Sequence, residues 1–168
     1  MKYFNGFSLH EEEGLFDAYC TKSLYSVAGF SYGAQQALEY VYHATERIDR
    51  LILLSPAFFQ TQKASFVRAQ LHYFETSKEA YVQQFLKNVA YPSKIDLTPY
   101  LHVGNKEDLE ALLSYVWDAQ KIETILSRGT TIEVFMGEKD KIVDTKEACQ
   151  FFTQTTNYII KGVGHLLR

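Results

Sequence analysis

Short apolar runs alternate with helical patterns along most of the chain, which favours a sheet of parallel strands. We expect five strands, at residues 2–4, 24–28, 50–54, 131–136 and 156–160. The runs at 51–54 and 132–136 are almost continuously apolar, as in strands that are covered on both faces. Apolar residues recur at helical spacing over 34–42, and further helices are expected near 10–19 and 145–152. The pattern therefore predicts an α/β fold.

Residues 57–128 break this alternation, because they contain several amphipathic helical patterns and no convincing strand. The stretch is too long for an ordinary connection between strands. We interpret it as a helical insertion between two strands, in the position of a lid. The chain of 168 residues is long enough for a single domain with a substantial core, so 1–168 is expected to form one domain.

Charge and hydropathy exclude some functions. The formal net charge of -3 gives no general basic surface for nucleic acid. No apolar run approaches the ~20 residues that span a bilayer, and no segment resembles a signal peptide. A cytoplasmic protein that acts without a membrane or nucleic acid is therefore expected.

The most informative motif is Gly29-Phe30-Ser31-Tyr32-Gly33, a G-x-S-x-G pattern between an apolar strand and a helical stripe. Small residues two positions on either side of the serine allow a sharp strand-to-helix turn, because their backbones can approach closely. The turn presents Ser31 at a helix N-terminus, where developing negative charge is stabilised. Ser31 is the candidate nucleophile; an incidental serine in a glycine-bounded turn is the alternative.

A serine nucleophile needs a base and a group that orients the base. Among five histidines, His165 follows the last expected strand in Gly162-Val163-Gly164-His165. Asp140 lies just beyond the preceding strand, so the chain order is Ser, Asp, His. Asp144 competes for the acidic role but is typical of a helix N-cap. Glu138 is a weaker candidate, and Asp140 could also be a solvated turn residue.

An oxyanion hole requires backbone amides that point at the developing charge. The amide of Tyr32, the residue after the nucleophile, is one candidate. The amide of Phe7, in the loop after the first strand, is the other. The same segment could instead be only a tight turn.

The motifs at 29–33, 137–140 and 162–165 resemble the three catalytic signatures of the α/β-hydrolase superfamily, in the same order. Asn5-Gly6-Phe7 is similar to the His-Gly-X oxyanion segment of that superfamily, with asparagine in place of histidine. The resemblance implies a compact α/β-hydrolase fold with a parallel sheet of about five strands and a helical lid insertion. Stretches 27–34, 54–59 and 85–92 further resemble the short pimeloyl-acyl-carrier-protein methyl ester esterases of the BioV type.

This narrower resemblance implies hydrolysis of the methyl ester of pimeloyl-acyl-carrier protein, releasing methanol before biotin ring assembly, without metal or cofactor. Aromatic residues of the insertion would then line an acyl channel: Phe58, Phe59, Phe66, Tyr73 and Phe74, with Tyr81 and Phe85. Basic residues would contact the acidic carrier protein: Lys63, Arg68, Lys78, Lys87 and Lys94. The aromatic residues could instead only pack the helices together, and the basic residues could form a solvated face.

Two other functions remain open from the sequence. A broad-specificity carboxylesterase would use the same three residues on small esters. A catalytically inactive hydrolase fold, kept as a binding module, would explain the shortened N-terminal region. A shortened sheet could also leave apolar surface that favours a homodimer.

Overall fold

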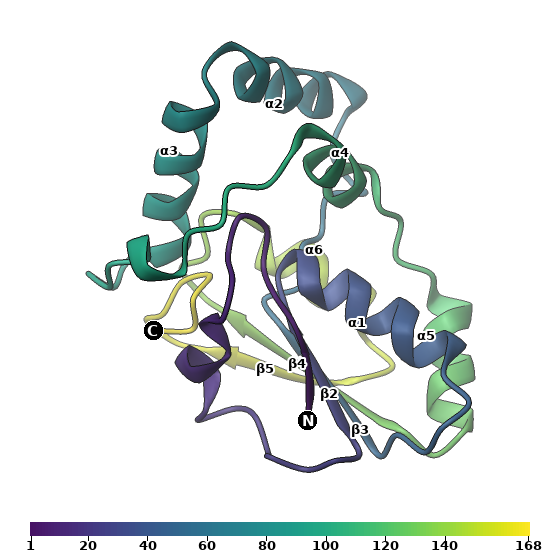
Figure 1. The fold of residues 1–168 in the computed structure, drawn as a ribbon. Helices are drawn as coiled ribbons and strands as arrows, with labels where there is room; N and C mark the ends of the chain where they lie inside the picture. Colours follow the sequence, from purple (N-terminus) through teal and green to yellow (C-terminus); the bar gives the residue numbers. More distant parts are fainter.

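A single parallel sheet organises the chain in the computed structural model, which describes residues 1–168 (Figure 1). The strands are β1 (Lys2–Phe4), β2 (Ser26–Phe30), β3 (Arg50–Leu54), β4 (Thr131–Gly137) and β5 (Thr156–Ile160). Each strand pairs in parallel with the next one along the chain. All carboxyl ends therefore meet at one edge of the sheet, and the expected five-stranded α/β architecture is confirmed.

The second strand begins two residues later than its apolar pattern predicts. Leu24 is 90% exposed and lies outside the sheet, whereas Phe30 is buried and pairs in register with Leu54. The expected range 24–28 was therefore wrong, because the apolar residue at 24 contributes to no core. The shift places the strand end directly before Ser31.

Helices follow the expected alternation. They are η1 (Glu12–Phe16, a 3-10 helix), α1 (Tyr32–His43), α2 (Ala64–Thr76), α3 (Lys78–Ala90), η2 (Thr98–Tyr100, a 3-10 helix), α4 (Lys106–Ser114), α5 (Ala119–Ser127) and α6 (Thr145–Phe151). The N-caps Asn105, Asp118 and Asp144 each accept a backbone amide of the first helical turn. The helix expected over 10–19 is only the short η1.

Alternate residues of the strands enter two separate hydrophobic cores. On one face, Leu51 and Leu53 of β3 pack with α1, α5 and α6. On the other face, Ile52 and Leu54 pack with residues of η1, the end of α3 and the C-terminus. Burial of both faces explains the nearly continuous apolar sequence of β3.

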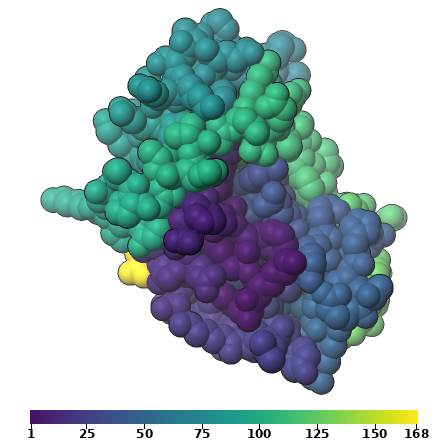
Figure 2. Space-filling model, viewed as in Figure 1, coloured from purple at the N-terminus to yellow at the C-terminus, as the bar shows by residue number.

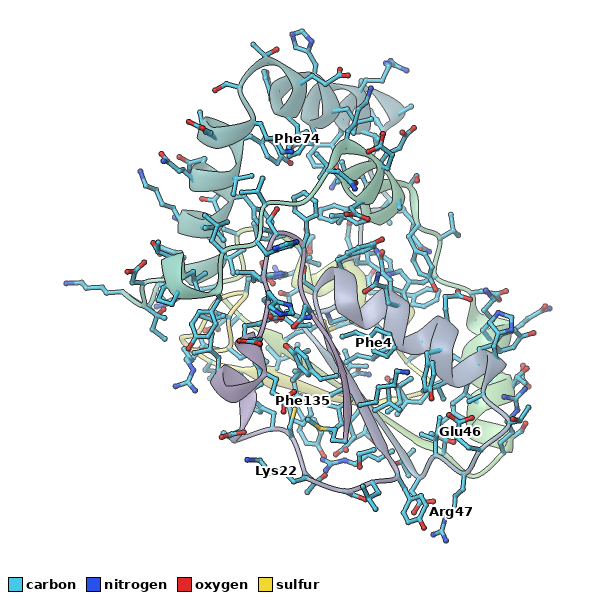
Figure 3. All side chains as sticks on the ribbon, viewed as in Figure 1. Phe4, Lys22, Glu46, Arg47, Phe74 and Phe135 are labelled. Atoms are coloured by element: carbon cyan, nitrogen blue, oxygen red, sulfur yellow. The ribbon has the colours of Figure 1, made fainter.

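The insertion between β3 and β4 divides into two parts. Helices α2, α3 and α4 stand away from the sheet (Figure 1), and the buried Phe74 points into the space between them (Figure 3). Helix α5 returns to the sheet and packs against α1 and β4. The part of 57–128 that covers the carboxyl edge therefore consists of α2–α4.

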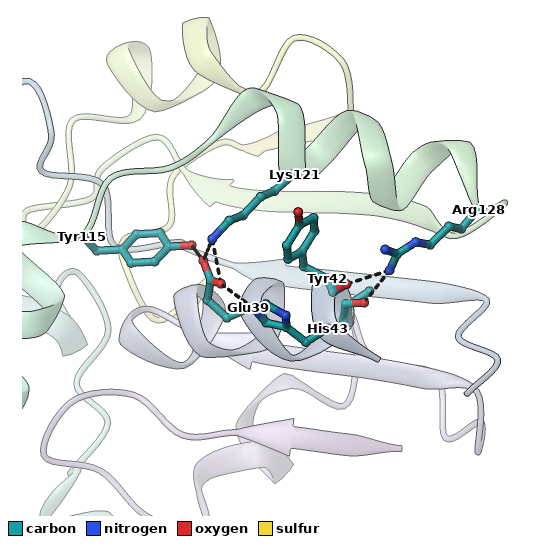
Figure 4. A network of polar contacts seen from close by, with 7 residues as sticks. Glu39, Tyr42, His43, Tyr115, Lys121 and Arg128 are labelled. Carbon is teal, nitrogen blue, oxygen red and sulfur yellow. Dashed lines mark hydrogen bonds and ion pairs between the residues drawn. The ribbon is translucent and has the colours of Figure 1, made fainter. Parts of the chain in front are cut away.

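A polar network fastens α5 and the segment before it to α1 (Figure 4). Glu39 of α1 accepts hydrogen bonds from Tyr115 at 2.6 Å and from Lys121 at 2.8 Å. Burial alone would raise the pKa of Glu39, but the hydrogen bonds from Lys121 and Tyr115 outweigh it and lower the pKa. Arg128 donates to the carbonyl of Tyr42 at the end of α1. The network fixes one end of the insertion to the sheet layer.

Candidate active site

Ser31 occupies a strained turn between β2 and α1. Its φ of 54° and ψ of -111° lie outside the regions that non-glycine residues usually adopt. A Cβ on Gly29 would collide with the backbone of Gly33, and a Cβ on Gly33 would collide with the carbonyl of Phe4. The two glycines are therefore required by close backbone packing, as the motif predicts for a nucleophile elbow.

His165 and Asp140 form a buried pair. Nδ1 of His165 lies 2.7 Å from Oδ2 of Asp140, and their side chains are 0% and 2% exposed. Oδ1 of Asp140 accepts the amides of Ile142 at 2.7 Å and Val143 at 3.0 Å. These amides fix the carboxylate, which in turn orients the imidazole.

The serine and the histidine lie at the same edge of the sheet. The Ser31 amide donates to the carbonyl of Leu54, and the next residue, Ser55, donates its hydroxyl to the His165 carbonyl at 2.6 Å. The imidazole also lies 5.0 Å, centroid to centroid, from the ring of Phe30. Nε2 of His165 is buried and has no hydrogen-bond partner, the Ser31 hydroxyl included. The structure therefore places Ser31 and His165 at one edge without a hydrogen bond between their side chains.

The competing acids have other roles. Asp144 caps α6 by accepting the amides of Lys146 and Glu147. Glu138 is exposed and accepts the amide of Gly162. Neither carboxylate contacts His165, so the pairing singles out Asp140. The other four histidines, His10, His43, His72 and His102, are exposed.

The loop after β1 lies beside the serine turn, where an oxyanion hole is expected. The amide of Phe7 takes part in no backbone hydrogen bond. Tyr32 is the first residue of α1, and amides in the first turn have no partner within a helix. The side chains of Phe7 and Tyr32 border a hollow of about 260 Å³, separate from the cavity that Ser31 lines.

The Glu12 side chain holds this loop in place, a contact that the sequence pattern does not indicate. Its side chain is buried, and Oε1 accepts the amide of Gly6 at 2.7 Å and the hydroxyl of Tyr3 at 3.1 Å. Oε2 has no partner. Burial raises the pKa of Glu12, although the hydrogen bonds from Gly6 and Tyr3 oppose that change. A glutamate within a run of three acids gave no signal of burial.

A cavity of about 460 Å³ opens between Ser31 and the insertion. Among the aromatic residues expected in an acyl channel, Phe59, Phe66 and Tyr73 line it, together with Tyr81 and Phe85. The remaining wall consists of Gln70, Gln84, Asn88, Leu109, Leu112, Leu113, Lys141 and Ile142. The wall is therefore mostly apolar, with neutral polar groups and one lysine.

Two of the aromatic residues expected in an acyl channel, Phe58 and Phe74, do not line this cavity. Phe58 is 4% exposed and packs against Phe151 and Phe152, on the side of α6, so it does not line the cavity. Phe74 is also 4% exposed and packs against Phe7 and Tyr81 inside the insertion. Both rings serve as core.

The five basic residues expected at a docking surface are exposed and form no ion pair: Lys63, Arg68, Lys78, Lys87 and Lys94. Lys87 and Lys94 border a separate surface hollow of about 450 Å³ near the end of α3. Their charge is therefore available to a partner.

No group of His, Cys, Asp or Glu residues is arranged to hold a metal ion. The helices also lack the combination of length and apolar character needed to cross a membrane.

Solved structures provide the comparison with known proteins. The carboxylesterase CesB from Bacillus subtilis superposes with a TM-score of 0.58 at 18% identity, over 96% of this chain and 62% of that chain. MenH from S. aureus gives a TM-score of 0.58 at 15% identity, over 97% of this chain and 85% of that chain. An alpha/beta hydrolase fold protein from Burkholderia ambifaria gives a TM-score of 0.57 at 17% identity, over 92% of this chain and 64% of that chain.

The chain spans less than two thirds of CesB and of the B. ambifaria protein. No protein-family model matches the chain, and no curated protein sequence matches it. The five-stranded parallel sheet, the serine turn after β2 and these superpositions together show that the chain has the α/β-hydrolase fold.

Proposed function

We propose that the chain is a serine carboxylesterase in which Ser31, His165 and Asp140 form the catalytic triad. The observation that carries the proposal is the buried His165–Asp140 pair, whose Nε2 is unoccupied at the edge where Ser31 emerges. Serine is a weak nucleophile, and an imidazole held in one orientation by a carboxylate is the base that activates it.

The proposed reaction has an acylation step and a deacylation step. Ser31 Oγ attacks the ester carbonyl carbon while Nε2 of His165 takes the hydroxyl proton. The oxyanion is stabilised by the amides of Tyr32 and Phe7. Collapse of the tetrahedral intermediate breaks the bond to the alkoxide, which receives the proton from His165. A water molecule, deprotonated by His165, then attacks the acyl-enzyme, releases the acid and restores Ser31.

As the specific substrate we propose the methyl ester of pimeloyl-acyl-carrier protein, with methanol as the leaving group and the free ω-carboxylate as the product for biotin synthesis. The mostly apolar cavity next to Ser31 suits an acyl chain. The unpaired basic side chains on α2 and α3 suit an acidic carrier protein, which would make the cytoplasm its place of action.

The triad is tested by labelling with a fluorophosphonate probe and by ester turnover. We expect the wild-type protein to gain the probe mass at Ser31, and the Ser31→Ala and His165→Ala variants to lose both labelling and turnover while keeping their circular dichroism spectra. A folded wild-type protein that resists the probe would support the inactive binding module instead.

The substrate is tested separately, with pimeloyl-carrier methyl ester and a free methyl ester as comparator. We expect a higher kcat/KM for the carrier-linked ester, and a loss of that preference when Lys78 and Lys87 are both replaced by glutamate. Equal turnover of short free esters would favour a broad-specificity carboxylesterase.

A further inference from the structure

One charged residue, Lys141, borders the cavity that Ser31 lines. The other residues of its wall are apolar, aromatic, amide or hydroxyl side chains, and Lys141 alone carries a charge. A cationic group in a mostly apolar wall discriminates between ligands by their charge, because few polar partners compete for it.

The positive charge of Lys141 is not neutralised by the protein. Lys141 forms no ion pair, and the neighbouring Asp140 directs its carboxylate to His165 and to two backbone amides. Lys141 is exposed at the edge of the cavity, and its ammonium lies 3.5 Å from the centroid of the ring of Tyr91, a residue outside the cavity wall, which leaves its charge uncancelled. The lysine is therefore positioned and available.

The backbone next to Asp140 explains how Lys141 comes to lie beside the cavity. Asp140 is fixed by the amides of Ile142 and Val143, so the backbone turns tightly through residues 140–143. Ile142 lines the same cavity, and Val143 is buried in the core. The turn that positions the acid thus also fixes the backbone from which Lys141 extends.

We propose that the ester taken by this cavity carries an anionic group, a carboxylate or a phosphate, away from its reacting carbonyl, and that Lys141 is the specificity-determining residue that binds it. This inference rests on the proposed role of Ser31 as nucleophile and is independent of the carrier-linked substrate, whose seven-carbon chain ends in an uncharged thioester. It names a substrate class, anionic esters, that the triad alone does not distinguish from neutral esters.

The test compares the monomethyl and dimethyl esters of a seven-carbon diacid, which differ in one negative charge at the far end. For the wild-type protein we expect a kcat/KM about five-fold higher for the monoester, a preference that falls as ionic strength rises. In Lys141→Gln the ratio of the two kcat/KM values should approach one, and in Lys141→Arg the preference should persist. A methyl ester with a terminal phosphate distinguishes phosphate from carboxylate recognition.

Lys139→Gln is the matched control, because Lys139 is exposed on the same loop and does not line the cavity. It should keep the wild-type ratio. A wild-type protein that hydrolyses both esters equally, or a Lys141→Gln variant that keeps the preference, would overturn the inference while leaving the triad intact. Absence of turnover for every ester, with no labelling of Ser31, would instead refute the proposed function.

Discussion

Replacing Glu12 with alanine tests whether its carboxylate holds the loop that carries the Phe7 amide. The change leaves the buried Gly6 amide without its acceptor at 2.7 Å, and a buried unsatisfied donor costs ~1–3 kcal/mol. The Tyr3 hydroxyl loses its partner as well, and the missing side chain leaves a small cavity. We expect the free energy of unfolding to fall by ~2–4 kcal/mol, with a lower kcat because the Phe7 amide is less well positioned.

Glu12→Gln separates the charge from the hydrogen bond, because its amide oxygen can still accept from Gly6. Burial raises the pKa of Glu12 above its ordinary value of 4.5, so the folded protein keeps this proton to higher pH than the unfolded chain. The contribution of the protonated carboxyl to stability is therefore complete below the unfolded pKa and is lost as pH rises through the folded pKa. Relative to wild type, the Gln variant should become more stable as pH rises above 4.5 and through the raised pKa of the folded protein.

Urea denaturation at several pH values measures both effects, and ester turnover on the same samples measures the loop. Glu13→Ala is the control, since Glu13 is the exposed neighbour in the same acidic run. If Glu12→Ala matched Glu13→Ala in stability and kcat, the carboxylate would not support the loop. If the stability difference between Glu12→Gln and wild type stayed constant with pH, the burial-driven change in pKa would be wrong.

Three further changes test other contacts. Gly33→Ala places a methyl group against the Phe4 carbonyl, so its melting temperature should fall by several degrees; an unchanged value would contradict the required glycine. Gln35→Leu leaves the Leu112 carbonyl without its amide donor at 3.0 Å, whereas the Ala57 carbonyl keeps the indole N–H of Trp117, so the change should cost ~1–3 kcal/mol in urea denaturation; a cost near zero would argue against that link. Asp140→Asn should lower kcat at least ~100-fold with a smaller change in KM, whereas near-native kcat would remove Asp140 from the triad.

Two strands and the serine turn could be predicted because each follows from a local sequence pattern. Residues 51–54 and 132–136 are apolar at every or nearly every position because both faces of their strands are buried, and this pattern needs no knowledge of the partner elements. The serine turn is also local, because two glycines four residues apart are needed wherever the backbones of a strand and a helix approach closely. Parallel pairing then brings the carboxyl ends of β2, β4 and β5 to one edge of the sheet. These are the strands that precede Ser31, Asp140 and His165.

The errors come from contacts between distant parts of the chain. Phe58 and Phe59 are adjacent and chemically identical, yet one ring turns toward α6 and the other toward the cavity. Glu12 is buried only because the loop after β1 folds back over it. No local pattern distinguishes these cases, since each depends on how the insertion and the N-terminal loop pack against the sheet.

Hydrogen bonds connect the insertion to the loop after β1, and this connection affects the geometry of the candidate site. The amide of His10 donates to the Tyr100 carbonyl, and the amides of His102 and Gly104 donate to the carbonyl and hydroxyl of Ser8. Figure 2 shows the green insertion packed directly against the purple N-terminal segment along this contact. Because the Phe7 amide precedes Ser8, movement of the insertion would displace an expected oxyanion donor as well as the cavity wall. We therefore expect substrate binding in the cavity and stabilisation of the oxyanion to be coupled through the backbone, and changes in the insertion to alter kcat as well as KM.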